Sequence, residues 1–115
     1  MPSTTSCDRG NIVLVRFVFA DEQGLKRRPA LVLSGPEYHA GRQETIVAAV
    51  TSNVSRLLPG DHPIDDWRGA GLPQPSVVTG ILRTIKRAMI ERSLGVLPAA
   101  DLRVVQDRLR VTLGL

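Results

Sequence analysis

The spacing of apolar residues changes once along the chain, and this change constrains the fold more than any other feature. Up to residue 96, short apolar stretches rich in Val and Ile alternate with Gly, Pro and Asp, as in β-strands joined by turns. From Ala99 onward, Leu102, Val105, Leu109 and Leu113 recur at helical spacing. The sequence therefore predicts a mainly β (α+β) protein, in which a small, strongly bent antiparallel sheet or barrel is capped by one C-terminal α-helix.

Five stretches have the apolar, β-branched composition of buried strands: 11–17, 30–34, 44–51, 76–82 and 90–96. A shorter strand is predicted around residues 62–64. Pro29 cannot donate a backbone hydrogen bond, so we expect it at the first position of the second strand, after a long polar connection over residues 18–27. We expect the 115 residues to form one domain, 1–115, with residues 1–8 disordered.

Composition favours an anionic partner and argues against several kinds of site. The net charge is +4, and thirteen of the fifteen cations are Arg, whose planar fork binds phosphate well. One cysteine, Cys7, can form no intramolecular disulfide, and with only two separated histidines we predict no metal site and no cofactor. No apolar run reaches the roughly 18 to 20 residues of a membrane span, and no signal peptide is evident, so we expect a cytoplasmic protein.

Two strand ends carry the side chains best suited to chemistry. Arg28 stands at the entrance of the second strand, and Thr51, Ser52 and Asn53 stand at the exit of the third. If these strands pair antiparallel, an entrance and an exit meet at one edge of the sheet. A guanidinium beside hydroxyls stabilises the charge that gathers on a phosphodiester during displacement, and RNA supplies its own 2′-hydroxyl nucleophile. A solvated arginine and a threonine with high β propensity explain the same pattern without any site.

Four blocks of the sequence resemble the PemK/MazF family of toxins from bacterial type II toxin-antitoxin systems. The blocks are RGNIVLVRFVFAD at 9–21, KRRPALVLS at 26–34, IVAAVTSN at 46–53 and AGLPQPSVV at 70–78. Their order and spacing fit the family, and the predicted helix lies where the family has one. The resemblance implies an SH3-like barrel that forms a homodimer and is neutralised by a cognate antitoxin protein.

The resemblance also implies an activity, that of an mRNA interferase. Such toxins are metal-independent, sequence-specific endoribonucleases that cut single-stranded RNA or mRNA and leave a 2′,3′-cyclic phosphate and a 5′-hydroxyl. The family's catalytic Arg, directly before Pro, corresponds to Arg28, and its catalytic Thr corresponds to Thr51. Because arginine stays protonated, we expect Arg28 to stabilise the phosphorane and donate to the leaving 5′-oxygen, while Thr51 holds a non-bridging oxygen. The general base is unassigned; His39 is a candidate outside the matching blocks.

The remaining candidates are expected to bind substrate. Lys26 and Arg27 are predicted to lie in a mobile loop that faces the phosphates. The other three substrate-binding candidates are Ser52, Asn53 and Asp21. One segment departs from the family: residues 83–89 read RTIKRAM, where many members carry a stretch like RTxDKSR. Cut-site preference and interface contacts are therefore not transferred from this segment.

Two other functions stay open at this stage. The first alternative is a toxin of the same fold that does not cleave RNA and inhibits a protein target such as DNA gyrase, although such a surface would not need Arg28 and Thr51. A barrel that only binds RNA is the second alternative, although two Phe, one Tyr and one Trp leave few platforms on which bases can stack.

Overall fold

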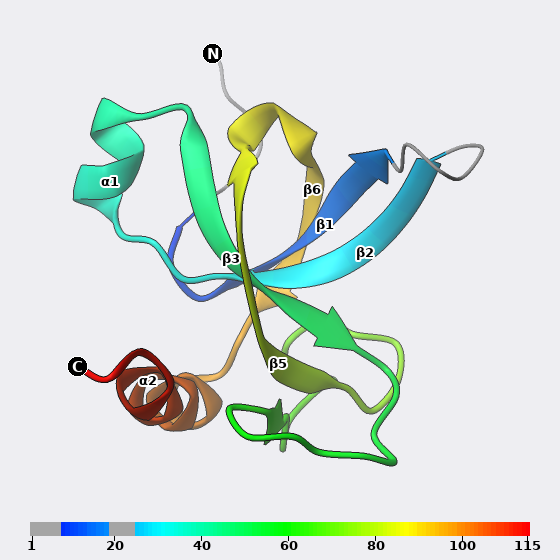
Figure 1. Cartoon of the computed structure of the whole chain (residues 1–115). Coiled ribbons are helices and arrows are strands. Elements are labelled where there is room, and N and C mark those ends of the chain that lie inside the picture. The colour runs from blue at the N-terminus through cyan, green and yellow to red at the C-terminus, as the bar shows by residue number, and fades with distance from the viewer. Residues whose placement is uncertain (1–7, 19–24) are drawn as a thin grey trace.

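One strongly bent antiparallel sheet forms the body of the protein, and a helix packs against one of its faces (Figure 1). The structure is a computed structural model and describes residues 8–18 and 25–115. Within this part of the chain the strand order is β4-β5-β3-β2-β1-β6, with every neighbouring pair antiparallel. The elements are β1 (Asn11–Val18), β2 (Leu25–Val32), α1 (Pro36–Gly41), β3 (Glu44–Thr51), β4 (His62–Pro63), β5 (Val77–Lys86), the 3-10 turn η1 (Arg87–Met89), β6 (Ile90–Val96) and α2 (Ala99–Leu113).

Irregular pairing bends the sheet. The register between β1 and β6 shifts after Ile12 and again after Leu14, and the register between β3 and β5 shifts between Ala48 and Val50. Such bulges increase the local twist and let a small sheet curl on itself. The predicted architecture, a bent antiparallel sheet followed by one C-terminal helix, is confirmed.

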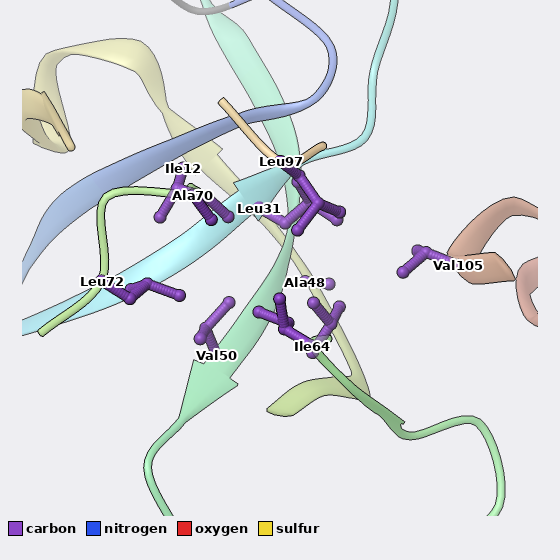
Figure 2. Close-up of a cluster of buried hydrophobic side chains, with 10 residues drawn as sticks. Ile12, Leu31, Ala48, Val50, Ile64, Ala70, Leu72, Leu97 and Val105 are labelled. Carbon is purple, nitrogen blue, oxygen red and sulfur yellow. The ribbon is translucent and has the colours of Figure 1, made fainter. Parts of the chain in front are cut away.

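The bent sheet buries two apolar clusters, because side chains alternate between its two faces along each strand. The first cluster lies between the sheet and α2, and it includes Ile12, Leu31 and Val105 (Figure 2). The second is built from Val13, Val15, Ala30, Val32, Val47, Ile85 and Ile90. The centres of β2 and β3 are therefore covered on both faces, and exposed functional side chains on these strands lie at the strand ends.

The second strand begins earlier than the sequence indicated. β2 starts at Leu25 rather than at Pro29, so Lys26 and Arg27 lie in a strand and not in the predicted loop. Residues 25–31 pair with β1, whereas residues 30–32 alone pair with β3. The polar residues before Pro29 carry no strand pattern of their own, and pairing with β1 overrides this weak local preference.

β5 is also longer than predicted. It continues past residue 82 to Lys86, because it pairs with β3 as far as Glu44, and the ammonium nitrogen of Lys86 lies 2.9 Å from the Glu44 carboxylate. The segment 83–89, which departs from the family pattern, is therefore a strand end followed by η1. Arg83 lies inside the sheet rather than in a basic connection.

The other elements agree with the sequence. The strands at 44–51 and 90–96 and the helix at 99–113 have the predicted bounds, and the short strand near residue 62 is present. Between β2 and β3 the chain forms the short helix α1. Residues 1–7, most of the stretch expected to be disordered, lie outside the described residues; the carbonyl oxygen of Asp8 accepts a hydrogen bond from the Asn11 amide at 3.0 Å.

Candidate active site

The site lies where β2 and β3 part. Their pairing ends at Ala30 and Ala49, and continuing the same register would place Arg28 opposite Thr51. Pro29 has no N–H to donate, so the two strands separate at this position and diverge, as Figure 1 shows. Arg28 and Thr51 thus stand at the open end of a fork, at the same edge of the sheet. The structure brings these two predicted residues together.

Two hollows flank this fork. The larger, of about 710 Å³, lies toward β5, and the smaller, of about 700 Å³, lies toward β1 and β6. Arg28, Pro29, Val50 and Thr51 line both hollows. A phosphate held between Arg28 and Thr51 would therefore have room on either side for the nucleotides that it joins.

The larger hollow has an apolar wall and cationic corners. The guanidinium carbon of Arg83 lies 5.0 Å from the ring centre of Phe17, and the exposed Ile81 stands beside them. An aromatic ring and a guanidinium plane are both surfaces on which a nucleobase can stack. Arg56 adds another positive charge to this lining. The hollow therefore suits a base with its phosphate.

Among the described residues, one carboxylate lines the larger hollow, and backbone amides donate to both of its oxygens. Asp61 Oδ2 accepts a hydrogen bond from the Leu58 amide and Oδ1 accepts one from the Gly80 amide, each at 2.9 Å. Asp61 therefore ties the segment before β4 to β5. Within the site, Asp61 therefore stabilises the backbone.

The smaller hollow is more polar. Ser52, Gln74 and Arg92 line it together with Arg27. Arg27 Nε donates to the Glu91 carboxylate at 2.8 Å, in a pair that is half exposed on the arginine side. Exposed pairs of this kind contribute about 1 kcal/mol or less, so Arg27 can exchange Glu91 for a phosphate at little cost.

Local hydrogen bonds orient the residues at the fork. Thr51 Oγ1 accepts from the Asn53 amide at 3.1 Å, so its hydroxyl hydrogen can point elsewhere and donate to an anion. Asn53 Oδ1 in turn accepts from the Ser55 hydroxyl at 2.7 Å. Arg28 is exposed, and its Nη1 donates to the Arg27 carbonyl oxygen at 3.1 Å. The contacts among Thr51, Asn53 and Ser55 hold the chain after β3 in a compact bend.

Only some of the predicted substrate-binding residues line a hollow. Ser52 and Arg27 line the smaller hollow and Asn53 lines the larger one. Lys26 is half-buried in β2 and lines neither hollow. Asp21 lies outside the described residues.

His39 is not part of this site. It lies in α1, which precedes β3 and stands at the opposite end of that strand from Thr51 (Figure 1). Its Nε2 is 2.6 Å from the Ser34 hydroxyl oxygen, and burial, together with the nearby Arg87 charge, lowers the pKa of the imidazole. Among the described residues, no histidine lines either hollow.

Over 8–18 and 25–115, no three or more His, Cys, Asp or Glu side chains are grouped so that they could hold a metal ion. In the same part of the chain, no helix combines the length and apolar character that a bilayer crossing requires.

Comparison with known proteins identifies the family. The sequence model of the family described as PemK-like, MazF-like toxin of type II toxin-antitoxin system matches residues 8–113. The chain belongs to this toxin family. Its sequence is similar to Endoribonuclease MazF2 of Mycobacterium bovis and to Endoribonuclease MazF6 of Mycobacterium tuberculosis. Each is 38% identical over 99 residues, covering 81% of this chain and 83% of the relative.

Solved structures of MazF toxins share the fold. The Mycobacterium tuberculosis toxin MazF-mt6 matches with a TM-score of 0.74 at 27% identity, covering 91% of this chain and 97% of that one. The crystal structure of MazE-MazF (Form-II) from Deinococcus radiodurans matches with a TM-score of 0.77 at 28% identity, covering 94% and 96%. The family and the fold predicted from the four sequence blocks are therefore confirmed.

Several residues that line the candidate site were not predicted from the sequence. They are Phe17, Arg56, Asp61, Gln74, Arg83 and Arg92. Arg83 had no signal in the sequence, because its pairing with Val47, on the same face of β3 as Thr51, depends on the extension of β5 beyond the predicted strand. Arg56 and Gln74 lie in irregular segments, and no periodicity marks them.

Proposed function

We propose that residues 1–115 form a single toxin domain that acts in the cytoplasm as a metal-independent, sequence-specific endoribonuclease of a type II toxin-antitoxin system. Its substrate is single-stranded RNA, including mRNA. Family membership supports this function, as does the name endoribonuclease carried by relatives of 38% identity. The observation that carries it is the placement of Arg28 and Thr51 at one fork between two hollows.

The proposed reaction uses the substrate's own nucleophile. The 2′-oxygen attacks the adjacent phosphorus, the bond from phosphorus to the 5′-oxygen breaks, and the 5′-oxygen leaves with a proton as a hydroxyl. Arg28 stabilises the negative charge of the phosphorane and donates to the leaving oxygen, and Thr51 donates to a non-bridging oxygen. Charge stabilisation by these groups is available without a bound metal. The proton of the 2′-hydroxyl is assigned to no side chain.

The two hollows give the substrate its direction. A base enters the larger hollow against Phe17 and Arg83, and the chain passes over the fork toward Arg27 and Arg92 in the smaller one. Arginines on both sides bind phosphates, and stacking holds a base, whatever the RNA sequence. The polar side chains beside the stacking surface select the base. Gln74, whose amide both donates and accepts, is suited to read a base edge.

The decisive experiment compares RNA with matched substrates. Purified protein in EDTA is expected to cleave single-stranded RNA, to leave DNA of the same sequence intact, and to produce 5′-hydroxyl ends whose sequencing reveals the cut site. A single 2′-deoxy nucleotide 5′ to that cut should block cleavage there, because the nucleophile is missing. RNA that stays intact with diverse transcripts, or a deoxy substitution that is still cut, would contradict the proposal. The two alternatives, a gyrase-directed toxin and a barrel that only binds RNA, both require intact RNA.

We also propose two protein partners, a second copy of this chain in a homodimer and a cognate antitoxin. The solved structure of MazE-MazF from Deinococcus radiodurans contains MazE together with MazF, which is a property of that protein. In this chain, three apolar side chains of segment 52–61 are 47% to 55% exposed: Val54, Leu57 and Leu58. Together with the cationic larger hollow, they form a surface that suits an acidic segment with apolar residues. Sedimentation at micromolar concentration is expected to give a dimer, and polyglutamate is expected to raise the KM for RNA. A monomer, or an unchanged KM, speaks against the corresponding partner.

A further inference from the structure

The segment 52–61 forms one wall of the larger hollow. It joins the end of β3 to β4 and contains neither helix nor strand, yet Arg56, Leu58 and Asp61 line the hollow. Most of its side chains are exposed, so little apolar packing holds it. The position of this wall therefore depends on how its two ends are attached, one at Thr51 and the other at His62.

The second end is attached to α2 through a buried pair. His62 Nε2 lies 2.8 Å from Oδ1 of Asp101, and the side chains of the two residues are only 8% and 3% exposed. Asp101 lies in the first turn of α2, 39 residues further along the chain. The helix contributes no residue to either hollow among the described residues, so the pair connects the site to an element outside it.

Asp101 accepts several hydrogen bonds from the residues that directly follow segment 52–61. Besides His62, it accepts hydrogen bonds from the amides of Asp65 at 2.9 Å and Asp66 at 3.2 Å. Burial by itself would raise the pKa of this carboxyl, but the bonds from Asp65, His62 and Asp66 outweigh it and hold the pKa below its ordinary value. Asp101 is thus a carboxylate with three donors, all from residues 62–66.

His62 depends on Asp101 for its orientation. Its other ring nitrogen, Nδ1, is buried and makes no hydrogen bond within the described residues. Because a carboxylate oxygen can only accept, Nε2 carries the hydrogen of this contact and donates it to Asp101. A histidine used only to fill space would be replaceable by an apolar side chain, whereas here a directed bond orients the ring and links β4 to α2, in addition to the pairing of His62 with Val78 of β5.

We propose that His62 and Asp101 are positioning residues for RNA binding, which fix the end of segment 52–61 and so set the Arg56 and Leu58 wall of the larger hollow. The inference rests on the proposed RNA cleavage. Asp61 attaches the same end to β5, but it lines the hollow itself, so its replacement would also change the substrate surface. His62 lies outside both hollows, and its replacement tests the attachment alone.

The test compares two substitutions of His62 with one control. His62→Leu keeps an apolar volume but removes the donor, whereas His62→Gln places an amide N–H near the position of Nε2. Asp107→Asn, on an exposed position of the same helix, is the matched control. We expect His62→Leu to raise KM for RNA about tenfold with kcat changed about twofold or less, because a hydrogen bond to a charged group is lost. His62→Gln should restore KM to within about threefold of the wild type, and Asp107→Asn should leave it unchanged.

Hydrogen exchange provides a readout that does not depend on cleavage. Amides of segment 52–61 should exchange faster in His62→Leu than in wild type, His62→Gln or Asp107→Asn. Partial unfolding would reduce kcat per total protein and leave KM unchanged, so a raised KM distinguishes positioning from lost stability. Unchanged exchange in His62→Leu, or an equal KM for the Leu and Gln variants, would overturn the proposal. A wild-type protein that cuts no RNA would instead count against the function, and exchange would still test the attachment.

Discussion

Arg28→Ala is expected to lower the kcat of RNA cleavage by about 100- to 1,000-fold, the usual effect of removing one preorganised donor to a developing oxyanion. Arg28 stands at the fork between β2 and β3, where both hollows meet, and its charge faces the place where a phosphate would sit. The side chain is exposed, so its loss should leave the fold intact. Single-turnover cleavage and thermal unfolding, measured on the same preparation, check the two halves of this expectation.

Arg27→Ala is the matched comparison, because it removes the same charge one residue away. Arg27 lies beside Glu91 and lines the smaller hollow but not the larger one. Its loss should raise KM by about threefold to tenfold and weaken the salt dependence of binding, with kcat changed about twofold or less. Equal losses of kcat in both variants would mean that charge alone matters, and a kcat retained in Arg28→Ala would remove Arg28 from the reaction.

The juxtaposition of Arg28 and Thr51 could be predicted because it depends on local signals. Pro29 and the apolar residues after it mark one end of a paired region, and the polar residues after Thr51 mark the other. Neighbouring strands of such length usually pair antiparallel, which brings these ends to one edge. The start of β2 was misplaced because the residues before Pro29 form a strand only through pairing with β1.

The walls of the site could not be predicted in the same way, because they depend on contacts between distant segments. Phe17 and Arg83 come from β1 and β5, which are not neighbours in the sheet, and they meet only because the sheet is bent. His62 and Asp101 meet across 39 residues, and neither position has a pattern that marks its partner. Such long-range contacts depend on how strongly the sheet bends, and the sequence pattern does not reveal the degree of bending.

Gly71→Ala is expected to cause the largest loss of stability. Gly71 has φ +83°, and a Cβ built on it would lie 2.1 Å from the Leu94 carbonyl oxygen and 3.2 Å from the Gly95 Cα. These neighbours are backbone atoms of β6, which pairs with β1, so neither side can move without disturbing the sheet. The clash and the unfavourable φ together should lower the free energy of unfolding by about 3 kcal/mol or more.

The close approach is equally tight from the side of β6, since a Cβ on Gly95 would lie 2.5 Å from the Ala70 carbonyl oxygen. Two controls separate the causes of the expected loss. Gly114 has φ +72° with no atom within 4 Å of the added Cβ, so Gly114→Ala isolates the backbone term, of about 1 kcal/mol. Gly41 has neither feature, and Gly41→Ala should be neutral or slightly stabilising. Thermal unfolding should place Gly71→Ala roughly 10 to 20 °C below the wild type. A Tm for Gly71→Ala equal to that of Gly114→Ala would show that the chain around Gly71, which lines the smaller hollow, can move away from β6. Backbone contact with β6 would then not hold this wall of the site.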